Sequence, residues 1–159
     1  MPDHPRRLVR HGMTLFLVGL LTGLAVQSMT NPRAGLAAHL EAVLNGIFLI
    51  VVGLAWRELA LGARAARVTY GLLVFGTWAN WATTTASAIL GSSKGTPIAG
   101  AGFEASPLAE NAVLAMLVLV SAAMIGACGT MAIRLWRARG PSVEANGKLA
   151  LERDGRATK

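Results

Sequence analysis

Four long apolar segments set the strongest constraint on what this chain can fold into. They run over residues 13–29, 36–56, 68–90 and 108–136. A helix needs about 20 apolar residues to cross roughly 30 Å of hydrocarbon, and backbone groups in lipid must be hydrogen-bonded within their own segment. The segments therefore predict an all-α integral membrane protein, with a bundle of four transmembrane helices formed by residues 1–140.

Composition supports this class of protein. Hydrophobic residues make up 53% of the chain and charged residues only 14%, and the formal net charge is +7. Charged residues make up about 25% of an average soluble domain. The basic residues lie between the apolar segments rather than along one stripe, so nucleic acid is not expected as a partner. Residues 141–159 carry mixed charges and are predicted to be a disordered cytoplasmic tail.

The distribution of positive charge predicts the orientation of the bundle. Two connections hold one basic residue each, Arg33 and Lys94. The remaining arginines near the apolar segments gather at the N-terminus, in the middle connection and after the last segment: Arg6, Arg7, Arg10, Arg57, Arg64, Arg67, Arg134, Arg137 and Arg139. Because basic residues favour the cytoplasmic side, both termini and the middle connection are predicted to be cytoplasmic.

The second segment holds three polar residues, His39, Glu41 and Asn45. Ionisable residues within a span usually face the bundle interior or a cavity. At about 100° per residue, Glu41 and Asn45 share one stripe of the helix, whereas His39 points roughly 120° or more away from it. The groups could face two cavities, or one site at a subunit boundary. Structural roles are the alternative: a carbonyl partner for His39, the helix dipole for Glu41, and an interhelical hydrogen bond for Asn45.

The third segment contains the stretch GTWANWATTTAS, which is polar on one face. Thr77, Asn80, Trp81 and Thr84 are spaced at i, i+3, i+4 and i+7, so this face is expected to meet protein or a cavity. Trp78 and Trp81 lie in the middle of the segment, where they would suit an aromatic ligand by stacked or edge-to-face contacts. Alternatively, the threonine hydroxyls bond the carbonyl four residues earlier in the helix.

Glu110 follows Ser106 and Pro107, which resemble a helix N-cap with proline at the first helical position. That structural role is sufficient for Glu110, and the alternative is a functional carboxylate turned into the bundle. The chain has no P-loop, dinucleotide fingerprint, HExxH or Ser-His-Asp arrangement, so the enzyme classes that depend on those motifs have no support.

Several stretches resemble one family, the bacterial hydroxylaminobenzene mutases, which are small four-helix membrane proteins. The resemblance covers roughly residues 7–137. It is carried by RHGMTLFLVGLLTG (10–23), NPRAGLAAHLEAVLNGIFLIVVGLAW (31–56), GTWANW (76–81), TPIAGAG (96–102) and ENAVLAMLV (110–118). It implies an isomerase of the bacterial inner (cytoplasmic) membrane that takes part in aromatic degradation and rearranges N-phenylhydroxylamine to 2-aminophenol. The rearrangement involves no net redox change, so no nicotinamide or flavin is expected.

A more distant resemblance is to styrene oxide isomerase. A histidine six positions before Asn-Gly, and a later Trp-Ala-Asn, recur here as His39, Asn45 with the next glycine, and residues 78–80. The resemblance implies that His39 is the axial ligand of a haem b between protomers of a trimer, with the iron as Lewis acid. The chain departs from that pattern at Gly76 and Thr84, where the isomerase has an acidic residue and a tyrosine, which disfavours epoxide isomerisation.

The resemblances and the residue patterns together assign roles to the polar residues. The predicted substrate is a small aromatic molecule. The predicted catalytic residues are Asn45 and Asn80, which would hold the departing hydroxyl, and Glu41 or Glu110 as general acid; the predicted substrate-binding residues are Trp78, Trp81, Thr77 and Thr84.

Three alternatives remain: a haem-dependent aryl epoxide isomerase, a small membrane transporter subunit, and a structural four-helix membrane module with no ligand. A transporter would space its polar groups through the full depth of the bilayer. Here the polar residues concentrate in the half of the membrane next to the first and third connections. This concentration favours a binding site over a path.

Overall fold

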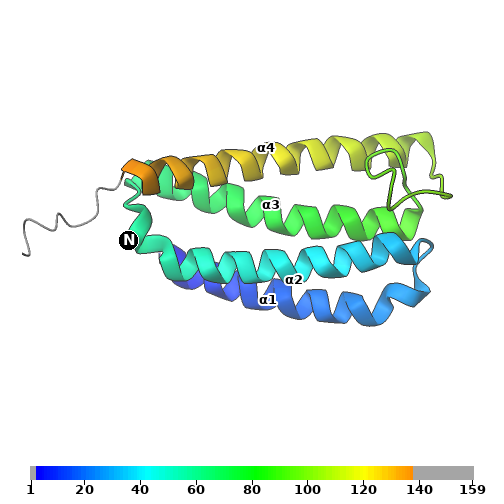
Figure 1. Cartoon of the computed structure of the whole chain (residues 1–159), viewed down its shortest axis with the longest axis horizontal. Helices are drawn as coiled ribbons and strands as arrows, with labels where there is room; N and C mark the ends of the chain where they lie inside the picture. The colour runs from blue at the N-terminus through cyan, green and yellow to red at the C-terminus, as the bar shows by residue number, and fades with distance from the viewer. Residues whose placement is uncertain (1–2, 138–159) are drawn as a thin grey trace, which may run out of the picture.

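A computed structural model describes residues 3–137, and this part of the chain is helical with no strand. The long helices lie side by side in an elongated bundle, each running opposite to the one before it (Figure 1). The elements in chain order are α1 (His4–Ala25), η1 (Val26–Ser28), α2 (Pro32–Ala55), η2 (Trp56–Leu59), α3 (Ala63–Leu90) and α4 (Pro107–Arg137). The predicted tail, residues 141–159, lies outside the described residues.

Each of the long helices begins earlier than the apolar pattern predicted, α1 and α3 by the largest margins. α1 begins at His4 rather than at residue 13, because Asp3 caps it by accepting a hydrogen bond from the Arg6 amide at 3.4 Å and Pro5 suits the first turn. α3 begins at Ala63 rather than at residue 68. Arginine and alanine are good helix formers, so each helix continues beyond its apolar part.

Three of the helices are long and apolar enough to cross a membrane. They span His4–Ser28, Pro32–Leu59 and Pro107–Arg137. The prediction of four spans is therefore supported by composition for three helices, whereas α3 is present but less apolar. The physical reason is the polar face of α3, where Thr77, Thr83, Thr84 and Ser87 are buried against the rest of the bundle.

Large apolar side chains cover the outside of the bundle. Leu24, Leu54 and Ile125 are 84%, 75% and 73% exposed. Exposed apolar surface of this extent marks a partner or a membrane in contact with it. The outer surfaces of α1, α2 and α4 are therefore suited to lipid.

Glycines bring α1 and α2 into close contact. A Cβ atom at Gly46 would lie 2.7 Å from the Phe16 amide nitrogen, and one at Gly19 would lie 2.9 Å from the Cβ of Ala42. Gly23 meets the ring of His39 on α2 in the same way. Gly19 and Gly23 form a GxxxG pair that packs on α2, a partner that the sequence alone did not identify. The small residues allow the close approach typical of membrane helices.

Hydrogen bonds join the first and third connections at one end of the bundle (Figure 1). Asn31 is fully buried, donates from Nδ2 to the Ala99 carbonyl at 2.8 Å, and caps α2 by accepting from the Ala34 amide at 3.2 Å. Thr30 donates to the Ile89 carbonyl at 2.7 Å. These bonds fix the ends of α2 and α3 relative to each other, and so set the register of the two helices that carry the polar residues.

Candidate active site

Glu41 on α2 and Asn80 on α3 are hydrogen-bonded across the helix interface. Nδ2 of Asn80 donates to Oε2 of Glu41, and both side chains are half-buried. Glu41 lies about 14 Å along α2 from Pro32, and Asn80 about 15 Å along α3 from Leu90, at about 1.5 Å per helical residue. The antiparallel pairing thus brings together two predicted site residues that are far apart in the sequence.

α1 contributes a third polar group, Thr22. Nε1 of Trp81 donates to Oγ1 of Thr22 at 3.1 Å, and the Thr22 hydroxyl donates to the Val18 carbonyl at 2.8 Å. Thr22, Glu41, Asn80 and Trp81 are called the polar cluster below. The sequence interpretation did not include Thr22, although a polar residue within an apolar segment was a signal for it.

The two tryptophans of α3 meet edge to face. Their ring centroids lie 5.8 Å apart with an interplanar angle of 85°, and the ring of His11 on α1 lies 6.4 Å from that of Trp78. The indole Nε1 of Trp78 is buried and has no hydrogen-bond partner within residues 3–137. Such a donor is free to bind an oxygen atom of a ligand. His11 is a second residue that the sequence interpretation missed.

The predicted substrate-binding threonines hydrogen-bond within their own helix. Thr77 is fully buried and donates to the Leu73 carbonyl at 2.8 Å, and Thr84 donates to the Asn80 carbonyl at 2.9 Å. Both hydroxyl groups therefore donate to the carbonyl four residues earlier, as the structural alternative predicted from the sequence. Each oxygen still has lone pairs with which to accept a hydrogen bond.

His39 faces α1, whereas Glu41 faces α3. Nδ1 of His39 lies 2.7 Å from the Gly19 carbonyl oxygen, and because a carbonyl can only accept, Nδ1 is the donor. This bond leaves the lone pair of Nε2 available. Asn45 is half-buried one turn beyond Glu41 on α2, and the Asn80 amide bonds Glu41 rather than Asn45. The two polar directions of α2 therefore meet different neighbours within the chain.

A cavity of about 370 Å³, here called the His39 cavity, lies beside this histidine. Its walls include Gly23, Leu20, Leu24 and Leu36, and the three leucines are also exposed on the outside of the bundle.

Residues 3–137 contain no group of three or more His, Cys, Asp or Glu side chains that could hold a metal ion. The imidazole of His39, with Nδ1 hydrogen-bonded to a carbonyl, could hold a haem iron through Nε2.

Glu110 lies in the first turn of α4 and binds the connection between α3 and α4. Its carboxylate accepts hydrogen bonds from the Ser92 hydroxyl at 2.7 Å and from the amides of Lys94, Ser93 and Ala105 at 2.8, 3.0 and 3.1 Å. Ser106 caps the helix, and Pro107 is its first residue. The N-cap arrangement predicted from the sequence is present, and the carboxylate bonds this connection rather than the polar cluster.

Within residues 3–137, these features define an all-helical fold with three helices that are long and apolar enough to cross a membrane, and with a polar cluster between α1, α2 and α3. A family model described as styrene oxide isomerase matches residues 4–136. The chain is 40% identical over 142 residues to hydroxylaminobenzene mutase HabB of Ectopseudomonas oleovorans, covering 89% of this chain and 85% of that protein. It is 40% identical over 121 residues to hydroxylaminobenzene mutase HabA of the same organism, covering 76% and 90%.

The chain therefore belongs to the styrene oxide isomerase family, and it is an isomerase. The resemblances stated from the sequence to the mutases and to styrene oxide isomerase are both confirmed.

Proposed function

We propose that this protein rearranges N-phenylhydroxylamine to 2-aminophenol in the bacterial inner membrane, with four spanning helices and both termini in the cytoplasm. The observation that carries the proposal is the 40% identity to a hydroxylaminobenzene mutase over 89% of the chain. The polar cluster and the neighbouring Trp78 support it, because they provide a carboxyl group, an amide and two indole rings, which suit the polar and aromatic parts of this substrate.

The reaction is a rearrangement without added atoms. The N–O bond breaks, a C–O bond forms at the neighbouring ring carbon, and the hydrogen lost from that carbon balances the hydrogen gained at nitrogen. Glu41 is the proposed general acid for the departing oxygen, and Asn80 orients its carboxyl group through the hydrogen bond between them. Asn45, on the same stripe of α2, holds the hydroxyl group during its transfer.

Glu110 is less suited than Glu41 to act as the general acid. Its carboxylate already accepts from Ser92, Ser93, Lys94 and Ala105, so its oxygens are occupied by the connection. The oxygens of Glu41 have one donor within residues 3–137, the Asn80 amide. The Glu41 carboxyl group can therefore still form hydrogen bonds with a ligand, as a residue that donates a proton to the substrate must.

Trp78 and Trp81 are the proposed wall for the aromatic ring of the substrate. Their edge-to-face arrangement leaves ring faces that suit stacked or T-shaped contacts with a phenyl ring. The unpartnered Nε1 of Trp78 provides a donor near that wall. Thr77 and Thr84 lie on the neighbouring turns of the same helix and complete the proposed substrate contacts.

We propose that His39 would hold the iron of a haem b through Nε2, because its Nδ1–H is already fixed by the Gly19 carbonyl. When bound, the iron supplies a Lewis acid. The exposed leucines around the His39 cavity provide an apolar rim that a second copy of the chain would cover. A homotrimer is the proposed assembly, in keeping with the resemblance to styrene oxide isomerase.

The first test is an assay of membranes that contain the protein. With N-phenylhydroxylamine as substrate, 2-aminophenol is the expected product. Glu41→Gln retains an oxygen acceptor for Asn80 but cannot donate a carboxyl proton, so kcat is expected to fall by about 10² to 10⁴. Glu104→Gln, at an exposed position in the third connection, is the matched control. Fully expressed protein with no product would refute the proposed activity.

The second test is the visible spectrum of the purified protein. A Soret band is expected in the wild type and its loss in His39→Ala, while His4→Ala and His11→Ala retain it. Wild-type protein purified from haem-replete cells without a Soret band would contradict the haem proposal and leave the assay for aminophenol unaffected.

An aryl epoxide isomerase is the second candidate, because the matching family model carries that description. The surroundings of Gly76 disfavour it. A Cβ atom there would lie 2.5 Å from Sδ of Met124 on α4, so an acidic side chain at this position would first have to displace that methionine. Formation of an aldehyde from styrene oxide, faster than aminophenol from the hydroxylamine, would favour this candidate instead.

A further inference from the structure

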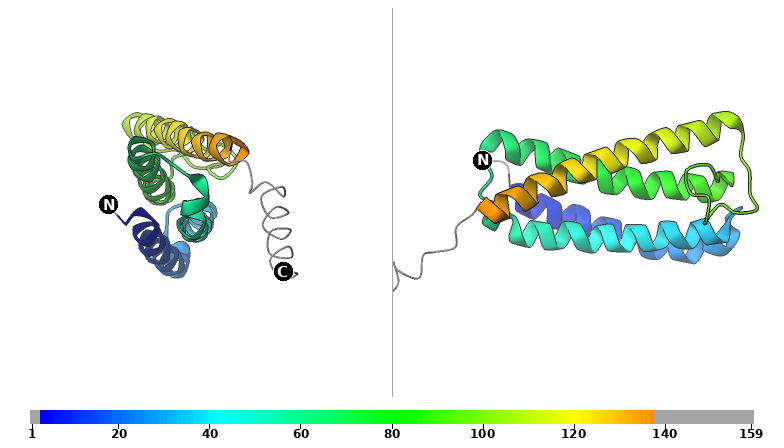
Figure 2. Two further views of the ribbon diagram at one scale, coloured as in Figure 1. Left: turned by 90° about the vertical axis from the view of Figure 1, so that its left-hand side faces the viewer. Right: turned by 45° about the horizontal axis from the view of Figure 1, so that its top comes forward.

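A second cavity lies at the opposite end of the bundle from Asn31. It has a volume of about 820 Å³ and lies where α1 begins, where α2 ends in η2 and where α3 begins. This end faces the viewer in the left view of Figure 2. His4, Trp56, Arg57, Leu61, Ala66 and Arg67 are among its lining residues. It is called the His4 cavity here, and the proposed isomerase reaction makes no use of it.

His4 is an unpartnered polar residue in the wall of this cavity. Its side chain is 8% exposed, and its Nδ1 is buried without a hydrogen-bond partner within residues 3–137. The ring lies between two aromatic rings, 4.7 Å from that of Tyr70 and 6.0 Å from that of Trp56. Buried polar atoms without partners are rare in folded proteins, and each points to a missing hydrogen-bonding group.

The charge of the cavity is positive. Arg57 and Arg67 both line it and are exposed. Asp3 is the single acidic residue in the lining, and its carboxylate already caps α1 through the Arg6 amide. Guanidinium groups bind phosphate oxygens through paired, charge-assisted hydrogen bonds. A ligand of this cavity is therefore expected to carry an anionic group.

The remaining walls are apolar. Trp56 is 8% exposed and Leu61 is half-buried, and both line the cavity together with Ala66. Leu54 and Val68, each within two residues of the lining, are 75% and 55% exposed on the outside of the bundle. A molecule with an anionic head and an apolar body matches this arrangement, because the exposed apolar helix surface begins beside the arginines.

We propose that the His4 cavity binds the headgroup of an anionic phospholipid. Arg57 and Arg67 bind the phosphate oxygens, and Trp56 contacts the apolar part of the lipid next to the headgroup. Basic pockets between membrane helices on the cytoplasmic side bind such headgroups. The proposal goes beyond the isomerase activity and rests on the insertion of the bundle in a membrane, which the apolar helices support.

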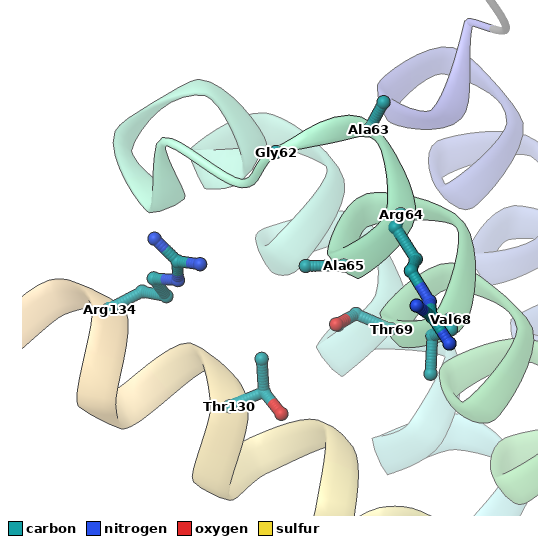
Figure 3. Close-up of a pocket in the computed structure, with 8 residues that line it drawn as sticks. All are labelled: Gly62, Ala63, Arg64, Ala65, Val68, Thr69, Thr130 and Arg134. Carbon is teal, nitrogen blue, oxygen red and sulfur yellow. The ribbon is translucent and has the colours of Figure 1, made fainter.

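Another cavity at the same end of the bundle, here called the Arg134 cavity, provides a matched control for the His4 cavity. It has a volume of about 560 Å³ and is lined by Arg64 on α3 and by Thr130 and Arg134 on α4. Figure 3 shows the two arginine side chains extending from different helices on either side of Thr69. This Arg134 cavity also holds two arginines, so removing them subtracts the same charge from the same end of the molecule without altering the His4 cavity.

The experiment is native mass spectrometry of the purified full-length protein with phosphatidylglycerol, and with phosphatidylcholine as the neutral lipid. The double variant Arg57→Gln/Arg67→Gln is expected to weaken phosphatidylglycerol binding at least about tenfold. The control variant Arg64→Gln/Arg134→Gln is expected to bind within about twofold of the wild type. His4→Phe, which retains ring packing against Tyr70 and Trp56, is expected to weaken binding as well.

Thermal unfolding provides the second readout. Phosphatidylglycerol is expected to raise the Tm of the wild type and of the Arg64→Gln/Arg134→Gln variant, but not that of the Arg57→Gln/Arg67→Gln variant. Equal weakening by both double variants would overturn the proposal, since it would indicate a diffuse charge effect. Displacement of the lipid by millimolar inorganic phosphate would overturn the choice of a lipid over a soluble anion.

Discussion

Substitution of Glu110 is expected to destabilise the fold without disabling the chemistry. Its carboxylate accepts hydrogen bonds from four donors: the Ser92 hydroxyl and the amides of Ser93, Lys94 and Ala105. Hydrogen bonds to charged groups contribute roughly 1.5–3 kcal/mol each, but water can replace part of this contribution in a partly exposed connection. At about 1 kcal/mol for each donor, Glu110→Ala is expected to cost about 4 kcal/mol and Glu110→Gln about half of that.

The measurement is thermal unfolding in detergent, together with the aminophenol assay. For a chain of this size, 1 kcal/mol corresponds to a shift in Tm of about 2–4 °C, so Glu110→Ala is expected to lower Tm by about 8–16 °C. Glu104→Gln, at an exposed position in the same connection, is expected to leave Tm unchanged. At temperatures well below its Tm, Glu110→Gln is expected to keep near wild-type kcat. A variant with wild-type Tm and a loss of activity of more than about a hundredfold would instead make Glu110 the general acid.

Two further substitutions test the positions of His39 and Trp81. Gly23→Ala places a Cβ atom 2.8 Å from Nδ1 of His39, so both the Soret absorbance and the aminophenol activity are expected to fall. Gly71→Ala, with nothing within 4 Å, is expected to leave both unchanged. Trp81→Phe removes the donor to Thr22 and is expected to lower the free energy of unfolding by about 0.5–1.5 kcal/mol beyond the loss of ring contacts. A double-mutant cycle with Thr22→Val measures the free energy that the Trp81–Thr22 hydrogen bond contributes to folding. A coupling energy of zero would show that this hydrogen bond contributes nothing.

The main elements of the fold follow from the sequence. The length and hydropathy of the segments predicted the long helices near their observed positions. Because successive connections lie at opposite ends of a helical bundle, Asn31 and the third connection were predicted to lie at the same end, and a hydrogen bond joins them there. The starts of α1 and α3 were placed too late, because hydropathy marks the part of a helix that suits lipid rather than the part that is helical. A cap such as Asp3 is the local signal for the true beginning.

The sequence indicated the polar residues of α2 and α3, but it did not indicate which of them pair across the helix interface. Helical periodicity alone placed His39 and Glu41 on different sides of α2, because the direction of a side chain depends only on its position along that helix. The bond from Asn80 to Glu41 depends on the register between α2 and α3, which the hydrogen bonds of the connections fix and no local pattern reveals. Thr22 was missed for the same reason, since its partner Trp81 belongs to another helix.

The bonds of the polar cluster also have a consequence for assembly of the chain in the membrane. α1 and α2 form one helical hairpin with close glycine contacts, and α3 and α4 form a second hairpin. Both the Glu41–Asn80 and the Thr22–Trp81 hydrogen bonds join one hairpin to the other. A newly inserted first hairpin therefore carries a carboxyl group that finds its amide partner only when the second hairpin arrives. The polar groups of the proposed reaction site thereby also favour correct association of the two hairpins during biogenesis.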